Sequence, residues 1–305
     1  MAGSYWRVLF SIVLVLSHHS FSVTSALDPS HGDEVTLITG ATGKTGALLY
    51  NSLVKAGHTV RGLVRSLEKA KEVLNCTSCD STDGVYVGDV TDESTLEAPM
   101  EGVTRLVILT SSVPLKADNG SFFFPPGQYP KDVDFLGVKK QVISAKNAGV
   151  KHVLLCSSMG STNPDNFLNK HLENVLFYKL NGEAVLLSSG VPFTIVKPGG
   201  LLGEDVPAGT RRLMVGHDDL LDSGVSSIPR ADVAEVFKQA IENPEESQGA
   251  RFDLGSDPSR HATGDFKTLF RDARDISVVE AGAGGAERGA WAGRKSGRQS
   301  TKVAH

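Results

Sequence analysis

The sequence has no excess of positive charge, no internal repeat and no apolar run long enough to cross a bilayer, and each absence excludes a class of protein. A net charge of −4, without a basic patch that interleaves aromatic residues, gives no reason to expect nucleic acid as a partner. The apolar run at residues 8–16 is too short for a stable membrane span. We therefore predict neither nucleic-acid binding nor a membrane-spanning segment.

Cysteine is also scarce, with three among 305 residues. Cys76 and Cys79 form a Cys-x-x-Cys pair, but no second pair completes a zinc site. The pair lies in a polar loop and not at the start of a helix, as a redox motif would. We predict no metal site, and a local disulfide is open to the pair if the chain is secreted. Cys156 lies in an apolar strand and is interpreted as a small buried hydrophobe.

Residues 1–26 have the pattern of a secretory signal peptide, in which Arg7 precedes the apolar run and small residues lie at the cleavage point. A membrane anchor and a buried core helix fit less well, because the run is short and polar residues follow it. The pattern predicts the secretory pathway or an organelle reached through it, and a cytoplasmic chain if the segment is not used. Asn75 and Asn119 begin glycosylation sequons, which matter only if the signal operates.

The rest of the chain has ordinary globular composition and is organised around three glycines that follow a short apolar strand at residues 35–39. Gly40 can take the sharp turn off the strand, Gly43 has no Cβ to block a pyrophosphate, and Gly46 lets the next helix pack closely on the sheet. The phosphates would lie at the helix N-terminus, where unpaired N–H groups and the helix dipole favour negative charge. This arrangement predicts a dinucleotide site.

Two other interpretations of the glycines compete with this one. A phosphate-binding P-loop requires a glycine where the sequence has Ile38, so that interpretation fails although Gly43-Lys44-Thr45 resembles the end of such a loop. A glycine turn that merely joins a strand to a helix is the plainer alternative.

Residues 58–64 complete a βαβ unit, and Arg65 stands at the end of this second strand. A cofactor with a free ribose 2′-hydroxyl usually calls for Asp or Glu near this point, whereas the first acid here is Glu68. A guanidinium suits a 2′-phosphate, and Lys44 in the glycine turn adds a second positive charge. The sequence therefore predicts NADP(H), with a solvated surface role for Arg65 as the alternative.

Further strands alternate with helices, which predicts an α/β fold with a doubly wound, mostly parallel sheet. The third and fourth strands end in Asp89 and in Thr110 and Ser111, at the edge where ligands of open α/β sheets bind. A loop at residues 113–130 interrupts the pattern, and we expect it to cover a site. The remaining elements are predicted at residues 132–148 (helix), 150–158 (strand), 173–189 (helix) and 192–200 (strand).

Short motifs occur in a fixed order between residues 35 and 270. They are Thr39-Gly-Ala-Thr-Gly-Lys-Thr-Gly46, Val64-Arg65, Gly88-Asp89-Val90, Ala148-Gly-Val-Lys-His152, Ser157-Ser-Met-Gly160, Lys197-Pro-Gly-Gly200 and Pro229-Arg-Ala-Asp-Val-Ala234. Three further segments are Gly127-Gln-Tyr-Pro130, Thr162-Asn-Pro-Asp165 and Val215-Gly-His-Asp-Asp219. The set resembles an atypical short-chain dehydrogenase/reductase, and in particular the NmrA-like, plant-type NAD(P)-binding proteins of that superfamily.

The resemblance implies a Rossmann core within residues 34–275 and a small C-terminal substrate lobe, mainly residues 199–262, filled by residues 211–215, the helix of Asp232 and residues 251–255. It also implies that many members bind NADP(H) without a proven substrate. Together with the reasoning above, it predicts NADP as the cofactor and gives as cofactor-binding residues Gly40, Thr42, Gly43, Lys44, Thr45, Gly46, Arg65, Asp89, Val90, Thr110, Ser111, Lys179, Pro198, Gly199 and Gly200.

The sequence departs from this family where the chemistry takes place. Members carry a tyrosine four residues before the active-site lysine, so that the ammonium lowers the pKa of the phenol for proton transfer. That position is Val175 here, and Tyr178, next to Lys179, lies about 100° away round the helix. Lys140 stands where an asparagine of the proton relay is common.

Lys179 and Ser158 are left as candidate catalytic residues, the lysine to hold the nicotinamide ribose and the serine to orient a carbonyl. A capping or turn role is equally open to Ser157 and Ser158. We predict a reductase of a small carbonyl or quinone-like substrate, with water or Tyr129 as the acid. The alternative is a non-catalytic NADP(H)-sensing protein that binds protein partners. Residues 276–305 are interpreted as a disordered tail or as the product of a mistaken gene prediction.

Overall fold

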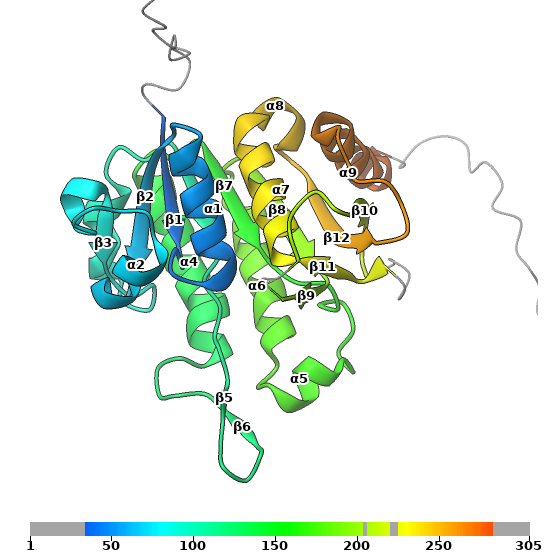
Figure 1. Cartoon of the computed structure of the whole chain (residues 1–305). Coiled ribbons are helices and arrows are strands. Elements are labelled where there is room, and N and C mark those ends of the chain that lie inside the picture. Colours follow the sequence, from blue (N-terminus) through cyan, green and yellow to red (C-terminus); the bar gives the residue numbers. More distant parts are fainter. Residues whose placement is uncertain (1–33, 204–205, 220–224, 283–305) are drawn as a thin grey trace, which may run out of the picture.

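An eight-stranded sheet runs through the middle of the computed structural model, which describes residues 34–203, 206–219 and 225–282 (Figure 1). Its strand order is β10-β12-β8-β7-β4-β1-β2-β3, and every neighbouring pair is parallel except β10 with β12. The strands are β1 (Val35–Thr39), β2 (Thr59–Val64), β3 (Val85–Val87), β4 (Arg105–Ile108), β7 (His152–Cys156), β8 (Phe193–Pro198), β10 (Arg212–Gly216) and β12 (Arg251–Asp257). The predicted doubly wound fold is confirmed.

Helices cover both faces of this sheet. On one face α1 (Lys44–Lys55) packs against α7 (Arg230–Glu242), and on the other α4 (Val138–Asn147) packs against α6 (Val175–Ser188). Each face has its own buried cluster, with Leu53 and Phe237 in the first and Val142 and Leu186 in the second. Burying one such side chain contributes roughly 1.5–3 kcal/mol, so the two clusters hold the strand ends in place.

Shorter helices connect these elements. They are α2 (Leu67–Val73), η2 (Ser81–Asp83), η3 (Glu93–Thr95), α3 (Glu97–Met100), the π-helix η4 (Lys131–Gly137), α5 (Phe167–His171) and α8 (Pro244–Ser247), and α9 (Phe266–Gly282) follows β12. The predicted helix at residues 132–148 is therefore real, but it begins as a π-helix and becomes α-helical only at Val138.

The strand order reverses at β1, which pairs with β2 on one side and with β4 on the other. The chain leaves the carboxyl ends of β1 and β4 toward opposite sides of the sheet, which opens a crevice between these two strands. In open α/β sheets this is where ligands bind, so the fold brings the ends of β1, β2, β3 and β4 to one place.

Two segments that the resemblance placed in the C-terminal lobe, at residues 211–215 and 251–255, fall within or overlap β10 and β12 and extend the main sheet. β12 has five consecutive buried residues and pairs with β8, and β10 adds to its outer edge. A strand buried along its length needs neighbours on both sides, which explains why it joins the sheet. The small parallel pair β9 (Gly200–Leu202) and β11 (Ser227–Pro229) lies outside the main sheet.

Both chain ends fall largely outside the described residues. The predicted signal peptide at residues 1–26 is among them, and so are residues 283–305 of the predicted tail. Helix α9 continues to Gly282, past residue 276 where the tail was predicted to begin. Within the described part of the chain, no helix is both long and apolar enough to span a membrane.

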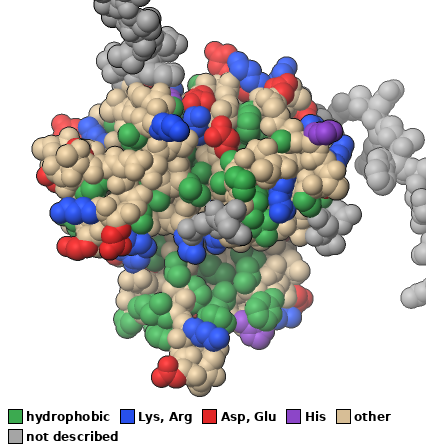
Figure 2. All heavy atoms as spheres, viewed as in Figure 1, with side chains coloured by type: hydrophobic (Ala, Val, Ile, Leu, Met, Phe, Trp, Pro, Cys, Tyr) green, Lys and Arg blue, Asp and Glu red, His purple; other side chains and the backbone are tan. Residues whose placement is uncertain are grey.

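The loop at residues 113–130 forms a hairpin of β5 (Leu115–Lys116) and β6 (Phe122–Phe123) that projects from the body of the molecule (Figure 1). Phe122 and Phe123 are about half exposed. Hydrophobic side chains gather on the lower part of the face shown in Figure 2.

In the loop after α2, Cys76 and Cys79 form the local disulfide that the sequence left open.

Candidate active site

The three glycines lie in the turn that joins β1 to α1. Gly40 has φ +73°, and its carbonyl accepts a 2.9 Å hydrogen bond from the Gly43 N–H. A Cβ on Gly46 would lie 2.1 Å from the Gly40 oxygen, so only glycine fits there. A Cβ on exposed Gly43 would lie 3.1 Å from the Gly40 oxygen, which is a tight contact, and would meet no other atom outside its chain neighbours within 4 Å. No side chain caps α1, which leaves its first N–H groups for an anion.

A cleft of about 510 Å³ begins at this turn. Its lining contains eleven of the predicted cofactor residues, which are Gly40, Thr42, Gly43, Lys44, Thr45, Gly46, Arg65, Asp89, Val90, Thr110 and Ser111. A cradle of glycines, an uncapped helix and a carboxylate at the far end fit a dinucleotide in shape and in charge. The cleft also contains residues that the sequence reasoning missed, among them Lys69, Gln128 and Arg230.

Two basic side chains lie at the far end of the cleft. Arg65 and Lys69 both line it, whereas Glu68 does not and instead accepts a 2.7 Å hydrogen bond from the Ser66 hydroxyl. The Asp89 carboxylate is fixed by the N–H and the hydroxyl of Thr91, both at 2.8 Å. Two cations therefore face the cleft at the end of β2 and the start of α2, where the sequence indicated one.

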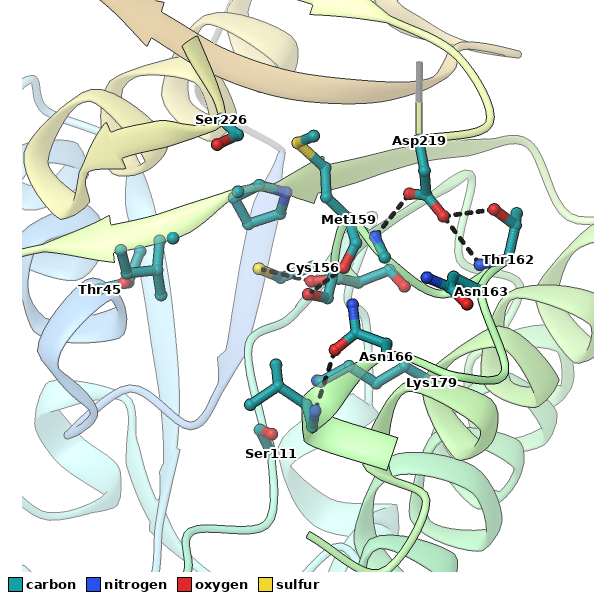
Figure 3. Close-up of a pocket in the computed structure, with 18 of the residues that line it drawn as sticks. Thr45, Ser111, Cys156, Met159, Thr162, Asn163, Asn166, Lys179, Asp219 and Ser226 are labelled. Atoms are coloured by element: carbon teal, nitrogen blue, oxygen red, sulfur yellow. Dashed lines mark hydrogen bonds between the residues drawn. The ribbon is translucent and has the colours of Figure 1, made fainter. Parts of the chain in front are cut away.

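A larger cavity of about 900 Å³ adjoins the cleft. It contains Lys179, Ser158 and the turn from Pro198 to Gly200, the predicted site residues that the cleft does not (Figure 3). Both volumes share Thr45, Leu109, Thr110, Ser111, Leu201 and Arg230. The two therefore meet along the ends of β1 and β4, and a ligand in one can touch a ligand in the other.

Lys179 lies at this junction, with 14% of its side chain exposed. Its ammonium forms a 2.8 Å ion pair with Asp134 of η4. Burial alone would lower the pKa of Lys179, but the charge and the hydrogen bond of Asp134 outweigh it, Cys156 and Glu183 add to them, and the pKa is raised above its ordinary value. Lys179 is therefore a cation throughout the neutral range.

The sequence analysis did not identify Asp134, because nothing in its local pattern marks it. It is 1% exposed and accepts four hydrogen bonds from three residues. Oδ1 accepts from Lys179 and from the Ser111 hydroxyl, both at 2.8 Å, and Oδ2 accepts from the Ser112 N–H at 3.0 Å and the Ser112 hydroxyl at 2.6 Å. One carboxylate thus joins α6 to the end of β4.

No phenol takes the place of the missing tyrosine among the cavity residues that the structure describes. Val175 is buried, and Tyr178 faces a separate pocket beside Phe177. Tyr129 is 41% exposed and lines neither the cleft nor the cavity, so the structure does not support it as the acid. The Lys140 ammonium donates to the Thr91 carbonyl, away from Lys179, so Asp134 rather than residue 140 is the polar partner of that lysine.

The residues after β7 form one wall of the cavity. Ser158 lines it and donates a 3.0 Å hydrogen bond to the Met159 carbonyl, while Ser157 is buried and donates to Glu183. Cys156 packs against the core as a partly buried side chain and also borders the cavity. Burial raises the pKa of its thiol to about 11, although Lys179 opposes the shift, so the thiol is protonated at neutral pH.

Asp219 holds the next part of this wall. Its carboxylate accepts hydrogen bonds from the N–H groups of Gly160, at 2.5 Å, and Thr162, at 2.8 Å (Figure 3). The fully buried Lys197 lies 3.4 Å away and also pairs with Asp253 at 3.0 Å. These contacts explain the second aspartate of the Asp-Asp segment noted in the sequence, because its carboxylate holds the loop that contains Gly160 and Thr162. The backbone of Asp219 is left-handed, with φ +64°.

The loop at residues 113–130 does not cover the site as we expected. Of its residues, Val113 and Gln128 line the cleft, while the β5–β6 hairpin projects from the body of the molecule and Phe122 and Phe123 of β6 are about half exposed (Figure 1). Within residues 34–203, 206–219 and 225–282, no cluster of three or more His, Cys, Asp or Glu side chains is arranged to hold a metal ion.

Comparison with known proteins points to the same kind of site. Residues 40–244 match the model of the NAD(P)H-binding family. The chain is 40% identical over 266 residues to sanguinarine reductase from Eschscholzia californica, covering 77% of this chain and 94% of that protein. It is 41% identical over 263 residues to an uncharacterised chloroplastic protein of Arabidopsis thaliana, covering 82% and 78%. The oxidoreductase ylbE from Lactococcus lactis shares the fold, with a TM-score of 0.58 at 18% identity and coverage of 81% and 97%.

Proposed function

The chain belongs to the NAD(P)H-binding family of atypical short-chain dehydrogenase/reductase-like proteins, and from this premise we propose that it reduces a small carbonyl or quinone-like substrate with NADPH. The observation that carries the proposal is the junction of the cofactor cleft with the 900 Å³ cavity, at which Lys179 lies. Sanguinarine reductase, a relative over most of both chains, is a reductase by name, which supports the reaction class.

The groups at the junction of the cleft and the cavity contribute to the proposed reaction in different ways. The bound nicotinamide supplies the hydride. The Lys179 ammonium binds the nicotinamide ribose, and the Ser158 hydroxyl, which lines the same cavity, orients the substrate oxygen. Pro198, Gly199 and Gly200 border the nicotinamide end. These roles rest on the position of each side chain along the two volumes.

The lack of a phenol restricts the substrate. Losing a positioned general acid typically costs about 10²–10⁴ in rate, which weakens reduction of a simple ketone most. An acceptor that requires little protonation as it receives hydride, such as a quinone-like ring, loses less. We infer that water in the open cavity supplies the proton, since Val175 cannot.

We further infer that NADP(H) is preferred over NAD(H). Arg65 and Lys69 line the adenosine end of the cleft, and the nearest acid, Glu68, does not. A 2′-phosphate would gain charge-assisted hydrogen bonds there, whereas a free 2′-hydroxyl would find no carboxylate at the end of β2. The dissociation constants of NADPH and NADH, measured side by side, test this preference.

The reductase proposal predicts turnover that depends on Lys179. NADPH absorbance is followed with a panel of aldehydes, ketones and quinones for the wild type, for Lys179→Ala and for the control Lys139→Ala, an exposed lysine on α4. We expect at least one acceptor to be reduced, a loss of about tenfold or more in Lys179→Ala, and no change in the control.

Folding must be compared as well, because removing one member of a buried ion pair costs about 3–5 kcal/mol. Lys179→Arg, which keeps the charge, is therefore measured alongside. Tight NADPH binding without reduction of any acceptor, together with a partner captured only in the presence of nucleotide, would instead assign the chain as a non-catalytic NADP(H) sensor. Equal turnover in a folded Lys179→Ala would contradict the role of the lysine.

The destination of the chain is a separate proposal. The sequence pattern of residues 1–26 predicts the secretory pathway, while a relative 41% identical to this chain is named as chloroplastic. We infer that the chain is delivered to an organelle, with the plastid supported by that relative. Residues 1–33 fused to a fluorescent protein should direct it to plastids. Retention of Met1 in a cytosolic product would contradict delivery, and glycosylation at Asn75 or Asn119 would favour the secretory route.

A further inference from the structure

Asp134 is a fully buried carboxylate whose two oxygens are both hydrogen-bonded, and the reaction proposed above assigns it no part. Its two oxygens accept four hydrogen bonds, from the Lys179 ammonium, the Ser111 hydroxyl and both donors of Ser112. It lies in η4, the π-helical turn that precedes α4. π-Helical turns are rare and are frequently found at functional sites.

The surroundings of Lys179 show what this carboxylate replaces. Position 175, one helical turn before the lysine, holds a buried valine, so no phenol shares that face of α6. The ammonium instead reaches across to a different element and pairs with Asp134 at 2.8 Å. The nearby Glu183 cannot take over, because it is engaged with Ser157 and with Arg251 at 2.8 Å.

We propose that Asp134 is the positioning residue that takes the place of the missing tyrosine as the partner of Lys179, holding the ammonium protonated and directed at the junction of the cleft and the cavity. Through Ser111 and Ser112 the same carboxylate fixes the end of β4, which both volumes share. The cation and the wall beside the nicotinamide end are thus held in one geometry. The catalytic consequence of this arrangement rests on the proposed reductase function.

The groups around Lys179 determine the direction in which its pKa is shifted. Those that face the ammonium are Asp134 from η4, Cys156 from β7 and Glu183 from its own helix. Burial lowers the pKa of the lysine and these groups raise it, with Asp134 first among them. Because the net direction is upward, the ion pair stabilises the fold at neutral pH and loses this effect only as the pH rises through the folded-state pKa.

Asp134→Asn removes the charge and keeps the shape, so burial of the lysine is then opposed far less. The readout is competitive acetylation with trace acetic anhydride across pH 7–11, followed by mass spectrometry of the peptide that contains Lys179. It requires neither cofactor nor substrate. Asp132→Asn is the matched control, because it makes the same chemical change in the same helical turn without contact to the lysine.

In the wild type we expect the labelling midpoint of Lys179 to lie above that of exposed Lys139. In Asp134→Asn it should fall by one pH unit or more, which gives about tenfold more labelling at a fixed pH below both midpoints. Asp132→Asn should match the wild type. An unchanged Lys179 midpoint in a folded Asp134→Asn would overturn the proposal, and so would a wild-type midpoint at or below that of Lys139, which decides the matter even if the variant does not fold.

The reductase function and the positioning role of Asp134 can be contradicted independently of each other. If no acceptor is reduced by the wild type, the reductase function falls, but the labelling experiment still decides whether Asp134 controls Lys179. If acceptors are reduced, the rate of Asp134→Asn should decline with rising pH at lower values than the wild type does. An alkaline profile identical to that of the wild type would overturn the positioning role while leaving the reductase standing.

Discussion

The proposed preference for NADP(H) depends mainly on Arg65, a single exposed side chain. It follows the last residue of β2, with Lys69 one turn into α2 beside it, and both border the same cleft. An exposed arginine contributes little to the stability of the fold, so the role that we propose for Arg65 is ligand binding. A 2′-phosphate presents two or three oxygens to the guanidinium, and such a charge-assisted contact is worth about 1.5–3 kcal/mol.

Arg65→Ala should therefore weaken NADPH binding by roughly tenfold or more and leave NADH binding nearly unchanged. Titration of both nucleotides against the variant and the wild type checks this. Lys71→Ala serves as the control, because Lys71 lies on α2, the helix that follows Arg65, but does not line the cleft. Equal loss for both nucleotides would mean that Arg65 supports the fold of the cleft and does not read the phosphate.

Residues were predictable where a local rule fixes them. Gly40, Gly43 and Gly46 follow from the geometry of one turn, and the structure gives the reason in a Gly40 oxygen that leaves no room for a Cβ on Gly46. Asp134 was not predictable, because its three partners lie 22, 23 and 45 residues away in the sequence. A carboxylate early in a helix is ordinarily interpreted as a favourable charge near the N-terminus, and no pattern in one sequence marks it as a ligand of a distant lysine.

At the scale of elements, strands and long helices followed from their periodicity, while irregular elements did not. The start of the predicted helix at residues 132–148 is a π-helix, and periodicity at 3.6 residues gives no sign of the difference. That irregular turn carries Asp134. The loop at residues 113–130 was expected to cover the site because long insertions often do, yet its two phenylalanines point outward on a hairpin.

The whole molecule was predicted correctly in class and less well in its C-terminal part. Alternation of strands and helices fixes a parallel sheet, and the reversal of strand order at β1 then fixes where the cofactor cleft lies. The segments of β10 and β12 were placed in a lobe on the strength of the family resemblance, whereas β12 has five consecutive buried residues and pairs with β8 in the sheet. Sequence order alone does not distinguish these two placements.

The central claim is that the cleft and the cavity form one site, with the cofactor in the first and its nicotinamide at the boundary with the second. A crystal structure of the chain with NADP tests this claim most directly. We expect the pyrophosphate on the Gly40 to Gly46 turn, the 2′-phosphate between Arg65 and Lys69, and the nicotinamide ribose within hydrogen-bonding distance of Lys179. A nucleotide bound elsewhere, or one with its nicotinamide turned away from the cavity that contains Lys179 and Ser158, would contradict the claim.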